Sequence, residues 1–391
     1  MLTNKSATFF NLIKPKYNEK VLLITLMMAL FGALFAQKVS KGLPSDKGES
    51  TKLPYTKMAL TAKLVGTAVS DPKWFNWCIS PIMGKDGKVH IFEARWPAEQ
   101  GDEGWKGRDA EIAHFVGERP EGPFTYVNTV LKTSDFPNPA KMWAPHNPRV
   151  SYVDGKYILL YIYQTKENDH IMHTGMMIAD DLNGPWKFAG EHDGMMVKNS
   201  TDPKHWTYQG VTGTENPTFM KIGKKYYIYF KSGTPTQRKA RYGYAVADQL
   251  EGPYTMSEQP ITDNIDYIED AVAFHANGNY YLLTTDNYGT NTGVFGDLIL
   301  WKSKTGLSFK LADAKIGMGT ILDYWGTPAD HKKLLSTPGH YEHSSSGKLE
   351  RPAVLLIDGK PAYFYSTAGL NISGGKVSEN YVFKIDWNKG N

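Results

Sequence analysis

The sequence predicts an all-β protein, a five-bladed β-propeller with four-stranded antiparallel blades. The first observation is a phrase that recurs five times: a polar pair, usually a proline, an apolar strand, a tight turn and an aromatic-rich strand. The copies are Cys78 to Arg95, Trp143 to Tyr163, Thr214 to Lys231, Ile268 to Thr285 and Leu349 to Thr367. Asp-Gly, Ile-Gly and Asn-Gly turns between alternating runs signal hairpins. A β-unit repeated roughly every 55–80 residues is typical of a propeller, so five copies predict five blades.

The second observation is a Gly-Pro phrase that follows several of the hairpins. It occurs at Gly117 to Val127, Ala179 to Ala189 and Ala247 to Met256, with a looser version at Trp301 to Lys310. Gly-Pro marks a turn or an edge strand, so each phrase predicts a connection to an outer strand. No long stretch shows helical periodicity, which leaves one domain of short strands.

The chain divides into three parts in order. Residues 1–36 contain lysines followed by an apolar run that ends at Ala36, which predicts a secretory signal peptide; a retained signal anchor is the alternative. Residues 37–56 are polar and predict a linker, and residues 57–391 form the propeller. Met58 to Val69 supplies a strand that helps to close the ring, and Asn380 to Trp387 supplies a blade-closing strand. The protein is therefore expected in the periplasm or secreted.

Composition excludes several classes of function. The net charge of +4 is mild and no Lys/Arg run alternates with aromatics, so we expect no nucleic acid and, once the signal is removed, no membrane. The single cysteine allows no intrachain disulfide, and the scattered histidines predict no metal site and no cofactor, although a structural calcium in the channel stays open. An aromatic content of 13% suits sugar binding, and we expect a monomer.

Polar residues gather just before the innermost strand of each blade, where a propeller opens its central channel. We align the copies on the proline, or on Ala271 in the fourth. The residues immediately before it are Ser80, Asn147, Asn216, Asp270 and Arg351, and those one position earlier are Ile79, His146, Glu215, Glu269 and Glu350. Polar groups that converge on one axis form either a binding site or a hydrogen-bonded plug.

These phrases resemble the five-bladed glycoside hydrolases of family 43 and relatives such as family 117. The resemblance rests on WAP-x-x-P at Trp143, on ENP before GKKYYIYF, and on the Gly-Pro strands, and it spans Trp74 to Trp387. It implies an inverting mechanism with three carboxylates, of which only the third-blade acid carries over, as Glu215. The first-blade base position reads Ser80 and the second-blade position reads His146, so the fold carries over further than the reaction.

The replacements favour a different reaction on an anionic oligosaccharide. Cationic groups suit a uronic acid, whose C5 proton is acidic once its carboxylate is neutralised. We expect dehydration of a uronate at the non-reducing end by β-elimination, which gives an unsaturated uronate. Arg351 holds the carboxylate, His146 is the base, and Glu215 protonates the leaving hydroxyl; a tyrosine is the alternative acid or base.

Other interpretations stay open. Inverting exo-hydrolysis would pair Glu215 with a base among Asp270, Glu269 and Glu350. A non-catalytic sugar-binding propeller is the third possibility. His146 would then bind a carbonyl group, and Glu350 and Arg351 would form a structural pair. The expected substrate-binding residues are Asn76, Trp77, Ser80, Trp143, Asn147, Arg149, Asn216, Glu269, Asp270 and Glu350, and Trp325 is a further stacking candidate.

Overall fold

The computed structural model describes residues 52–166, 168–190, 194–210, 212–233, 239–336 and 347–387, with only the backbone of residues 168–170. All of them lie in one compact unit within residues 48–391. The predicted signal peptide and residues 37–51 of the predicted linker fall outside the described residues. In the described ranges no helix is both long and apolar enough to cross a membrane.

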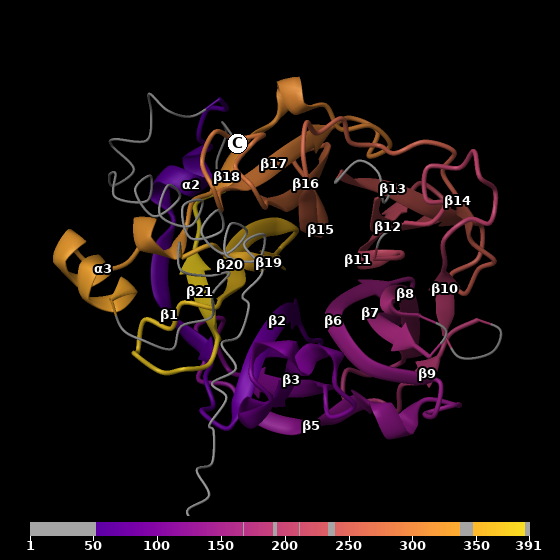
Figure 1. The fold of residues 1–391 in the computed structure, drawn as a ribbon, viewed down its shortest axis with the longest axis horizontal. Helices are drawn as coiled ribbons and strands as arrows, with labels where there is room; N and C mark the ends of the chain where they lie inside the picture. The colour runs from indigo at the N-terminus through magenta and orange to yellow at the C-terminus, as the bar shows by residue number, and fades with distance from the viewer. Residues whose placement is uncertain are drawn as a thin grey trace, which may run out of the picture. The chain divides into compact units, whose positions relative to one another are not determined.

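Five antiparallel sheets surround a central axis (Figure 1). The first blade consists of β2 (Trp74–Met83), β3 (Val89–Pro97), β4 (Glu111–Gly117) and β5 (Thr125–Lys132). The second consists of β6 (Met142–Val153), β7 (Lys156–Thr165), β8 (Asn168–Ala179) and two short strands that both pair with β8, β9 (Lys187–Phe188) and β10 (Met195–Val197). The third consists of β11 (Glu215–Ile222), β12 (Lys225–Gly233), β13 (Ala240–Ala247) and β14 (Thr255–Met256).

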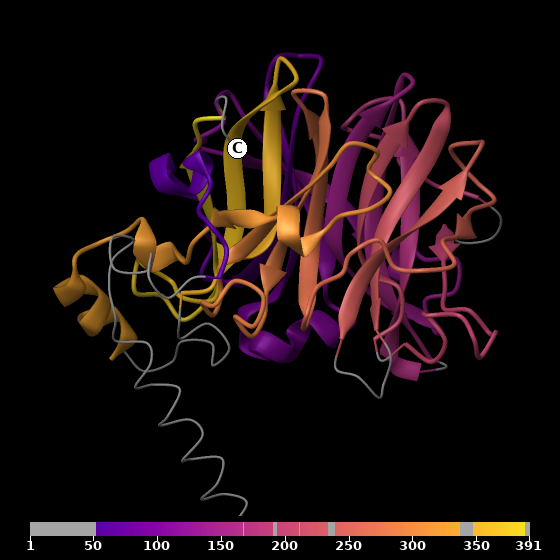
Figure 2. The ribbon, with the colours of Figure 1, turned by 90° about the horizontal axis from the view of Figure 1, so that it is seen from above.

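The last two blades complete the ring. The fourth consists of β15 (Ile268–Ala276), β16 (Asn279–Asp286), β17 (Leu298–Ser303) and β18 (Lys315–Met318). The fifth consists of β19 (Glu350–Ile357), β20 (Lys360–Ala368), β21 (Glu379–Lys384) and β1 (Lys63–Val69). Each innermost strand packs against the innermost strands of both neighbouring blades, in the cycle β2, β6, β11, β15, β19. The predicted five-bladed propeller is confirmed, and Figure 2 shows the blades side by side.

Helices in the described residues are short. The α-helices there are α2 (Lys57–Thr61) and α3 (Pro328–Leu335), and the 3-10 helices are η1 (Ala98–Gln100), η2 (Asp102–Lys106), η3 (Thr133–Asp135), η4 (Leu311–Asp313) and η5 (Ile321–Asp323). Of these, η1 and η2 matter most here, because they form the insertion between β3 and β4.

The hairpin turns follow from residues that tolerate left-handed backbone. At Asp154-Gly155, Asn277-Gly278 and Asp358-Gly359 both residues have positive φ, between 48° and 84°. That conformation matches the right-handed twist of the flanking strands, which is why these dipeptides connect β6 to β7, β15 to β16 and β19 to β20. The Gly-Pro phrases connect β4 to β5, β8 to β9 and β13 to β14, as predicted.

The first strand closes the ring against the last. β1 pairs with β21 in antiparallel register, with Lys63 opposite Lys384 and Thr67 opposite Tyr381. The strand predicted over Met58 to Val69 is therefore present but starts later, because Thr56 caps α2 through its Oγ1, which accepts from Ala59 N at 3.0 Å. Residues 52–56 of the predicted linker also join the fold, since Ile316 N donates to Pro54 O at 2.9 Å.

Candidate functional site

Left-handed backbone occurs in every innermost strand at the end that faces the central pocket. Positive φ values of 48°, 52°, 51°, 67° and 54° occur at Cys78, Asn147, Asn216, Asp270 and Arg351. None is glycine, so each carries a conformational cost that local structure must sustain, and such residues cluster at functional sites. The strand register shifts at each of these residues. The residue just before each one lies at the central pocket.

This comparison corrects the alignment in the first blade. The residue equivalent to Asn216 is Cys78, not Ser80, and the one equivalent to Glu215 is Trp77, not Ile79. Ser80 corresponds instead to Thr218: the Ser80 hydroxyl accepts from Val150 N at 2.9 Å, as the Thr218 hydroxyl does from Ala273 N at 2.9 Å. Alignment on the proline failed because Pro81 comes three residues after Cys78, whereas Pro217 directly follows Asn216.

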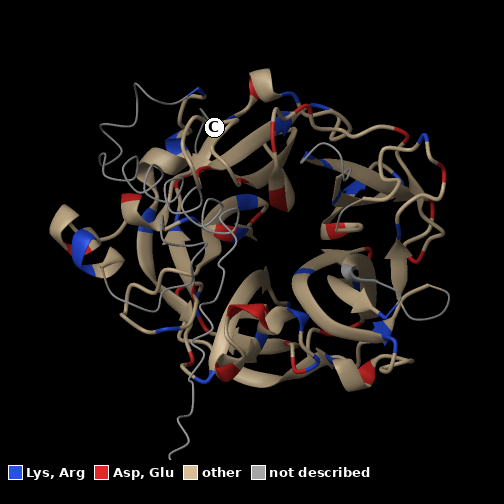
Figure 3. Cartoon of the chain, in the orientation of Figure 1, with Lys and Arg blue, Asp and Glu red and all other residues tan. Residues whose placement is uncertain are grey.

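A pocket of about 420 Å³ lies on the axis at this end of the innermost strands. One residue from each blade enters it at the equivalent position: Trp77, His146, Glu215, Glu269 and Glu350. Its walls differ in character, because acidic and basic residues occur around the ring centre on β11, β15 and β19 (Figure 3) whereas blade 1 contributes mainly aromatic rings. The size suits one or two sugar rings.

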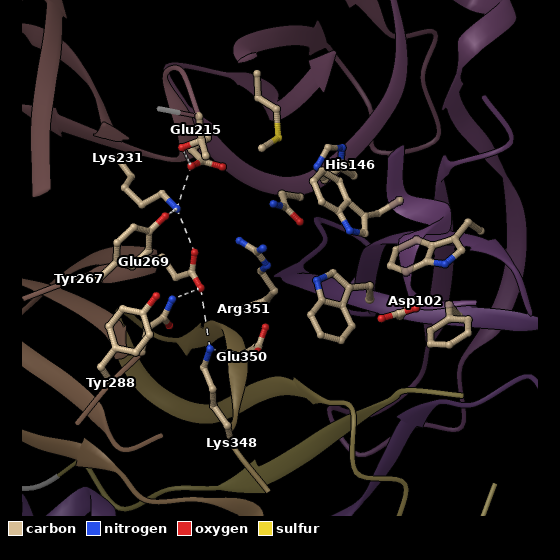
Figure 4. Close-up of a pocket in the computed structure, with 18 of the residues that line it drawn as sticks. Asp102, His146, Glu215, Lys231, Tyr267, Glu269, Tyr288, Lys348, Glu350 and Arg351 are labelled. Carbon is tan, nitrogen blue, oxygen red and sulfur yellow. Dashed lines mark hydrogen bonds and ion pairs between the residues drawn. The ribbon is translucent and has the colours of Figure 1, made fainter. Parts of the chain in front are cut away.

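The charged wall is a ladder of alternating carboxylates and lysines (Figure 4). Lys231 Nζ lies 2.8 Å from Glu215 Oε1 and 2.9 Å from Glu269 Oε2. Lys348 Nζ lies 3.8 Å from the other oxygen of Glu269 and 3.0 Å from Glu350 Oε1. Burial opposes ionisation here, but the two lysines and Arg351 lower the pKa of Glu269, and the carboxylates of Glu215 and Glu269 raise that of Lys231. Glu269 and Lys231 therefore stay charged.

Arg351 stands beside the ladder with its guanidinium in the pocket (Figure 4). Its Nη1 pairs with Asp270 Oδ1, and Asp270 also accepts from Asn216 Nδ2 at 2.5 Å. Burial and the carboxylates of Glu269 and Glu350 raise the pKa of Asp270 to about 6, against the lowering effect of Arg351. Asp270 and Asn216 do not line the pocket but hold Arg351 in place. The predicted Glu350–Arg351 pair is replaced by Glu350–Lys348 and Arg351–Asp270.

Arg149 lies on the other side of the pocket floor. Its guanidinium donates at 3.4 Å to the carbonyl oxygens of Ile79, Asp270 and Ala271, and it lines a second cavity at the opposite mouth of the channel, together with Ser80. Arg149 therefore contacts the backbone beneath the pocket and does not line it.

His146 is buried and neutral. Its Nδ1 lies 2.6 Å from the carbonyl oxygen of Ala144, which can only accept, so the proton is on Nδ1 and Nε2 keeps its lone pair. Burial, with a smaller contribution from Arg351, lowers the pKa of His146 to about 3, although the hydrogen bond to Ala144 opposes both. A neutral imidazole with an acceptor nitrogen therefore lines the pocket.

The aromatic wall comes from the first blade and its insertion. Phe75 stacks on Trp96 at 5.6 Å, and Trp96 Nε1 donates to Gly101 O at 2.7 Å, which fixes the insertion to β3. The insertion adds Trp105, whose ring centre is 5.3 Å from that of His146. It also adds Asp102, the one pocket-lining carboxylate that forms no ion pair with another described residue.

Three further predicted binding residues lie away from the pocket. The Asn76 amide is buried and donates to Trp74 O at 3.2 Å. Trp143 Nε1 donates to Lys106 O at 3.2 Å, and the Arg108 guanidinium covers its ring at 4.9 Å. Trp325 stacks on His331. These side chains have structural contacts, whereas Trp77 and Asn147 line the pocket.

Several pocket residues were not predicted: Asp102, Trp105, Lys231, Tyr267, Tyr288 and Lys348. Two of them carried a usable signal. Lys231 lies in the second strand of the third hairpin and pairs in register with Glu215, and Lys348 precedes Glu350 by two residues, the spacing of one strand face. Asp102 and Tyr288 lie in loops whose path no local pattern indicates. Among the described residues no group of three or more potential ligands is placed to hold a metal.

Comparison with known proteins places the fold. No protein-family profile and no curated protein matches the chain. Among solved structures, Zg3597, a family 117 glycoside hydrolase from Zobellia galactanivorans, is similar with a TM-score of 0.61, 15% identity and coverage of 85% of this chain and 92% of that one. CoXyl43, a GH43 β-xylosidase/α-arabinofuranosidase from a compost metagenome in complex with xylotriose, is similar with a TM-score of 0.54 and 16% identity. The match covers 85% of this chain and 97% of that one. These likenesses support a shared propeller fold.

Proposed function

We propose that this protein is a carbohydrate-active enzyme that removes water from a uronic acid at the non-reducing end of an oligosaccharide. The observation that carries the proposal is the neutral imidazole of His146, which lines the same pocket as the guanidinium of Arg351. Similar propellers are glycoside hydrolases, and one holds xylotriose, which supports a sugar as the substrate class.

The proposed reaction begins with binding of the sugar carboxylate to Arg351. Only Nη1 of Arg351 pairs with Asp270, so other N–H donors of this guanidinium remain for a substrate. Neutralising the carboxylate makes the C5 proton more acidic, because the charge that develops spreads onto an oxyanion beside a cation. His146 Nε2 takes this proton, a C4–C5 double bond forms, and the C4–O bond breaks.

The leaving hydroxyl must gain a proton to depart as water. We assign this proton to Glu215, whose Oε1 faces Lys231 and the Thr212 hydroxyl. Tyr267 is the second candidate. Its oxygen accepts from Lys231 Nζ at 3.0 Å, and burial raises the pKa of Tyr267 to about 12, so the phenol keeps a proton to donate.

Exo-hydrolysis is the second candidate reaction, and one observation favours it. An inverting hydrolase needs an ionised base across the pocket from its acid. The ladder carboxylates are each paired with lysine, but Asp102 has no such partner and lies across the pocket from Glu215 (Figure 4). Asp102 is therefore a better base for hydrolysis than the three residues suggested by the sequence.

A paired assay separates these reactions. The full chain is incubated with oligosaccharides ending in glucuronic, galacturonic or mannuronic acid, and ultraviolet absorbance and reducing ends are followed together. Dehydration raises absorbance through the new conjugated double bond and leaves reducing ends unchanged. New reducing ends without absorbance, lost in Asp102→Asn, would establish hydrolysis instead. Sugar binding without either signal would support a binding propeller and overturn both reactions.

A further inference from the structure

We infer that Tyr288 and Phe295 form a stacking platform for the second sugar of the chain, next to the terminal uronate. This inference rests on the proposed function for the direction in which the chain enters. Both rings line the pocket, yet 54% of Tyr288 and 38% of Phe295 is exposed. Large apolar rings exposed at a pocket mouth are typical of binding surfaces.

The loop that carries both rings is held by hydrogen bonds to a buried aspartate. Asp286 is fully buried at the end of β16 and accepts from Asn291 N at 3.0 Å, Thr292 N at 2.8 Å and the Thr292 hydroxyl at 2.9 Å. Asn291 Oδ1 in turn accepts from Ile265 N at 2.8 Å, which joins the loop to the strand connection before β15. The loop is therefore held in one shape before any ligand arrives.

A glycine brings the two arms of this loop together. Gly289 has a φ of 69°, and a Cβ there would lie 2.6 Å from Phe295 N. Only glycine allows this close approach, which places Tyr288 and Phe295 at the same rim. Tyr288 also meets Tyr267 in a T-shaped contact at 6.1 Å, so its ring orientation is fixed beside the charged ladder.

The chemistry of this rim suits a sugar ring rather than another charge. The carboxylate of a terminal uronate is held at Arg351, within the pocket, so the next ring lies farther out. Aromatic rings stack on the apolar C–H faces of sugars and need no charge to do so. The ligand class is thus an oligosaccharide of at least two units, which predicts poor binding of a single uronic acid.

Isothermal titration tests the platform without turnover when every protein carries His146→Ala, which removes the proposed base. The probes are a methyl glucuronoside and a disaccharide with glucuronic acid at its non-reducing end. We expect this parent protein to bind the disaccharide about tenfold more tightly, and added Tyr288→Ala/Phe295→Ala to lose about that factor for the disaccharide alone. Tyr288→Phe keeps the ring and should keep the affinity. Tyr152→Ala removes an equally exposed tyrosine at the opposite mouth and is the matched control.

The outcomes distinguish this inference from the proposed reaction. A preference for the disaccharide that the double variant abolishes supports the platform even if no product forms, in which case only the dehydration fails. Equal affinity of the parent protein for both probes, including no binding of either, overturns the platform. So does an equal loss for both probes on adding the two ring substitutions while thermal unfolding matches the parent protein.

Discussion

Burial sets the charge state of His146 and thereby its chemistry. The ring is 3% exposed, and its Nδ1 proton is directed to the Ala144 carbonyl. A histidine with a pKa of about 3 is neutral at every ordinary pH, so its Nε2 keeps an unprotonated lone pair, although the ring is a weak base. The substrate carboxylate would favour the protonated ring that forms during reaction, which offsets its low intrinsic basicity.

Replacing His146 should stop the chemistry and spare binding. In His146→Ala we expect the dehydration rate to fall by at least about 100-fold, because a positioned base contributes a factor of this size. The affinity for a uronate-ended disaccharide should change little, because Arg351 and the rim remain. Single-turnover kinetics and titration measure the two quantities. His275→Ala, at the opposite mouth, is the control. Equal losses of rate in both variants would contradict the assignment.

The same burial predicts a pH dependence of stability. The pKa of His146 falls from 6.5 to about 3 on folding, so between these values the unfolded chain binds the extra proton and acid destabilises the fold. The contribution is fully present above pH 6.5 and is lost as pH falls toward 3. Asp270 acts in the opposite direction, because its pKa rises on folding.

Comparison of the wild type with His146→Gln isolates the contribution of His146 to the pH dependence of stability. Between pH 6.5 and pH 5 the difference in free energy of unfolding between the two proteins should change by about 2 kcal/mol, in favour of the variant at the lower pH. Urea denaturation at both values measures it. A constant difference would show that His146 is not buried and neutral in the folded state.

At the scale of elements, the charged ladder connects three blades. Glu215 begins β11, Glu269 lies in β15 and Glu350 begins β19, while Lys231 and Lys348 bridge them. A buried carboxylate without its cation is costly, so the ladder stabilises the inner strands only while it is complete.

Removing Lys231 should therefore destabilise the protein strongly. We expect Lys231→Met to lower the free energy of unfolding by about 3–5 kcal/mol, because it leaves the buried side chains of Glu215 and Glu269 without their shared cation. Adding Glu215→Gln should recover part of this loss. Lys225→Met, on the same strand but paired with Asp248 at the surface, should change it by less than about 1 kcal/mol. Denaturant titrations of the four proteins check the order. Similar losses in both lysine variants would contradict the ladder.

Individual strands also show where sequence reasoning succeeds. Hairpins depend on local turn residues such as Asp154-Gly155, so the blades could be predicted one at a time. The position of a left-handed residue within a strand has no comparable local signal. For that reason the proline matched Ser80 with Asn216, although Cys78 adopts the equivalent left-handed backbone. Likewise, Lys231 faces Glu215 from the neighbouring strand, so only the hairpin register reveals it.

At the scale of the whole molecule, one strand closes the ring. β1 comes from the N-terminal side of the propeller and completes the fifth blade beside β21. Its Ala68 and Val69 are buried with Val382 and Tyr365 of that blade. Loss of β1 would expose this core and leave an open sheet edge.

A chain that starts at Ser70 should thus be much less stable than the full chain. We expect its melting temperature to fall by roughly 10 °C or more, because several apolar side chains that β1 buries become exposed to water. Circular dichroism on heating measures the change, and exchange of Leu60, an exposed residue of α2, for alanine serves as a control near the same end. An unchanged melting temperature would show that the ring does not depend on β1.

The site is less predictable than the fold because it exists only across blades. His146, Glu215 and Glu350 could be placed on one axis from the repeat alone, and all three line the pocket. Asp102 and Tyr288 enter from insertions after β3 and β16, and their position depends on tertiary contacts rather than on the repeat. Arg149 carries the same charge as Arg351, yet it lies outside this pocket and lines the cavity at the opposite mouth of the channel.

The most direct test of the account is the mass of the product formed from a uronate-ended trisaccharide. We predict a single product lighter than the substrate by one water, with all three sugars still joined, and none of it from His146→Ala. Two shorter products whose masses sum to the substrate plus one water would contradict the account and would direct attention to Asp102 and Glu215 as a hydrolytic pair.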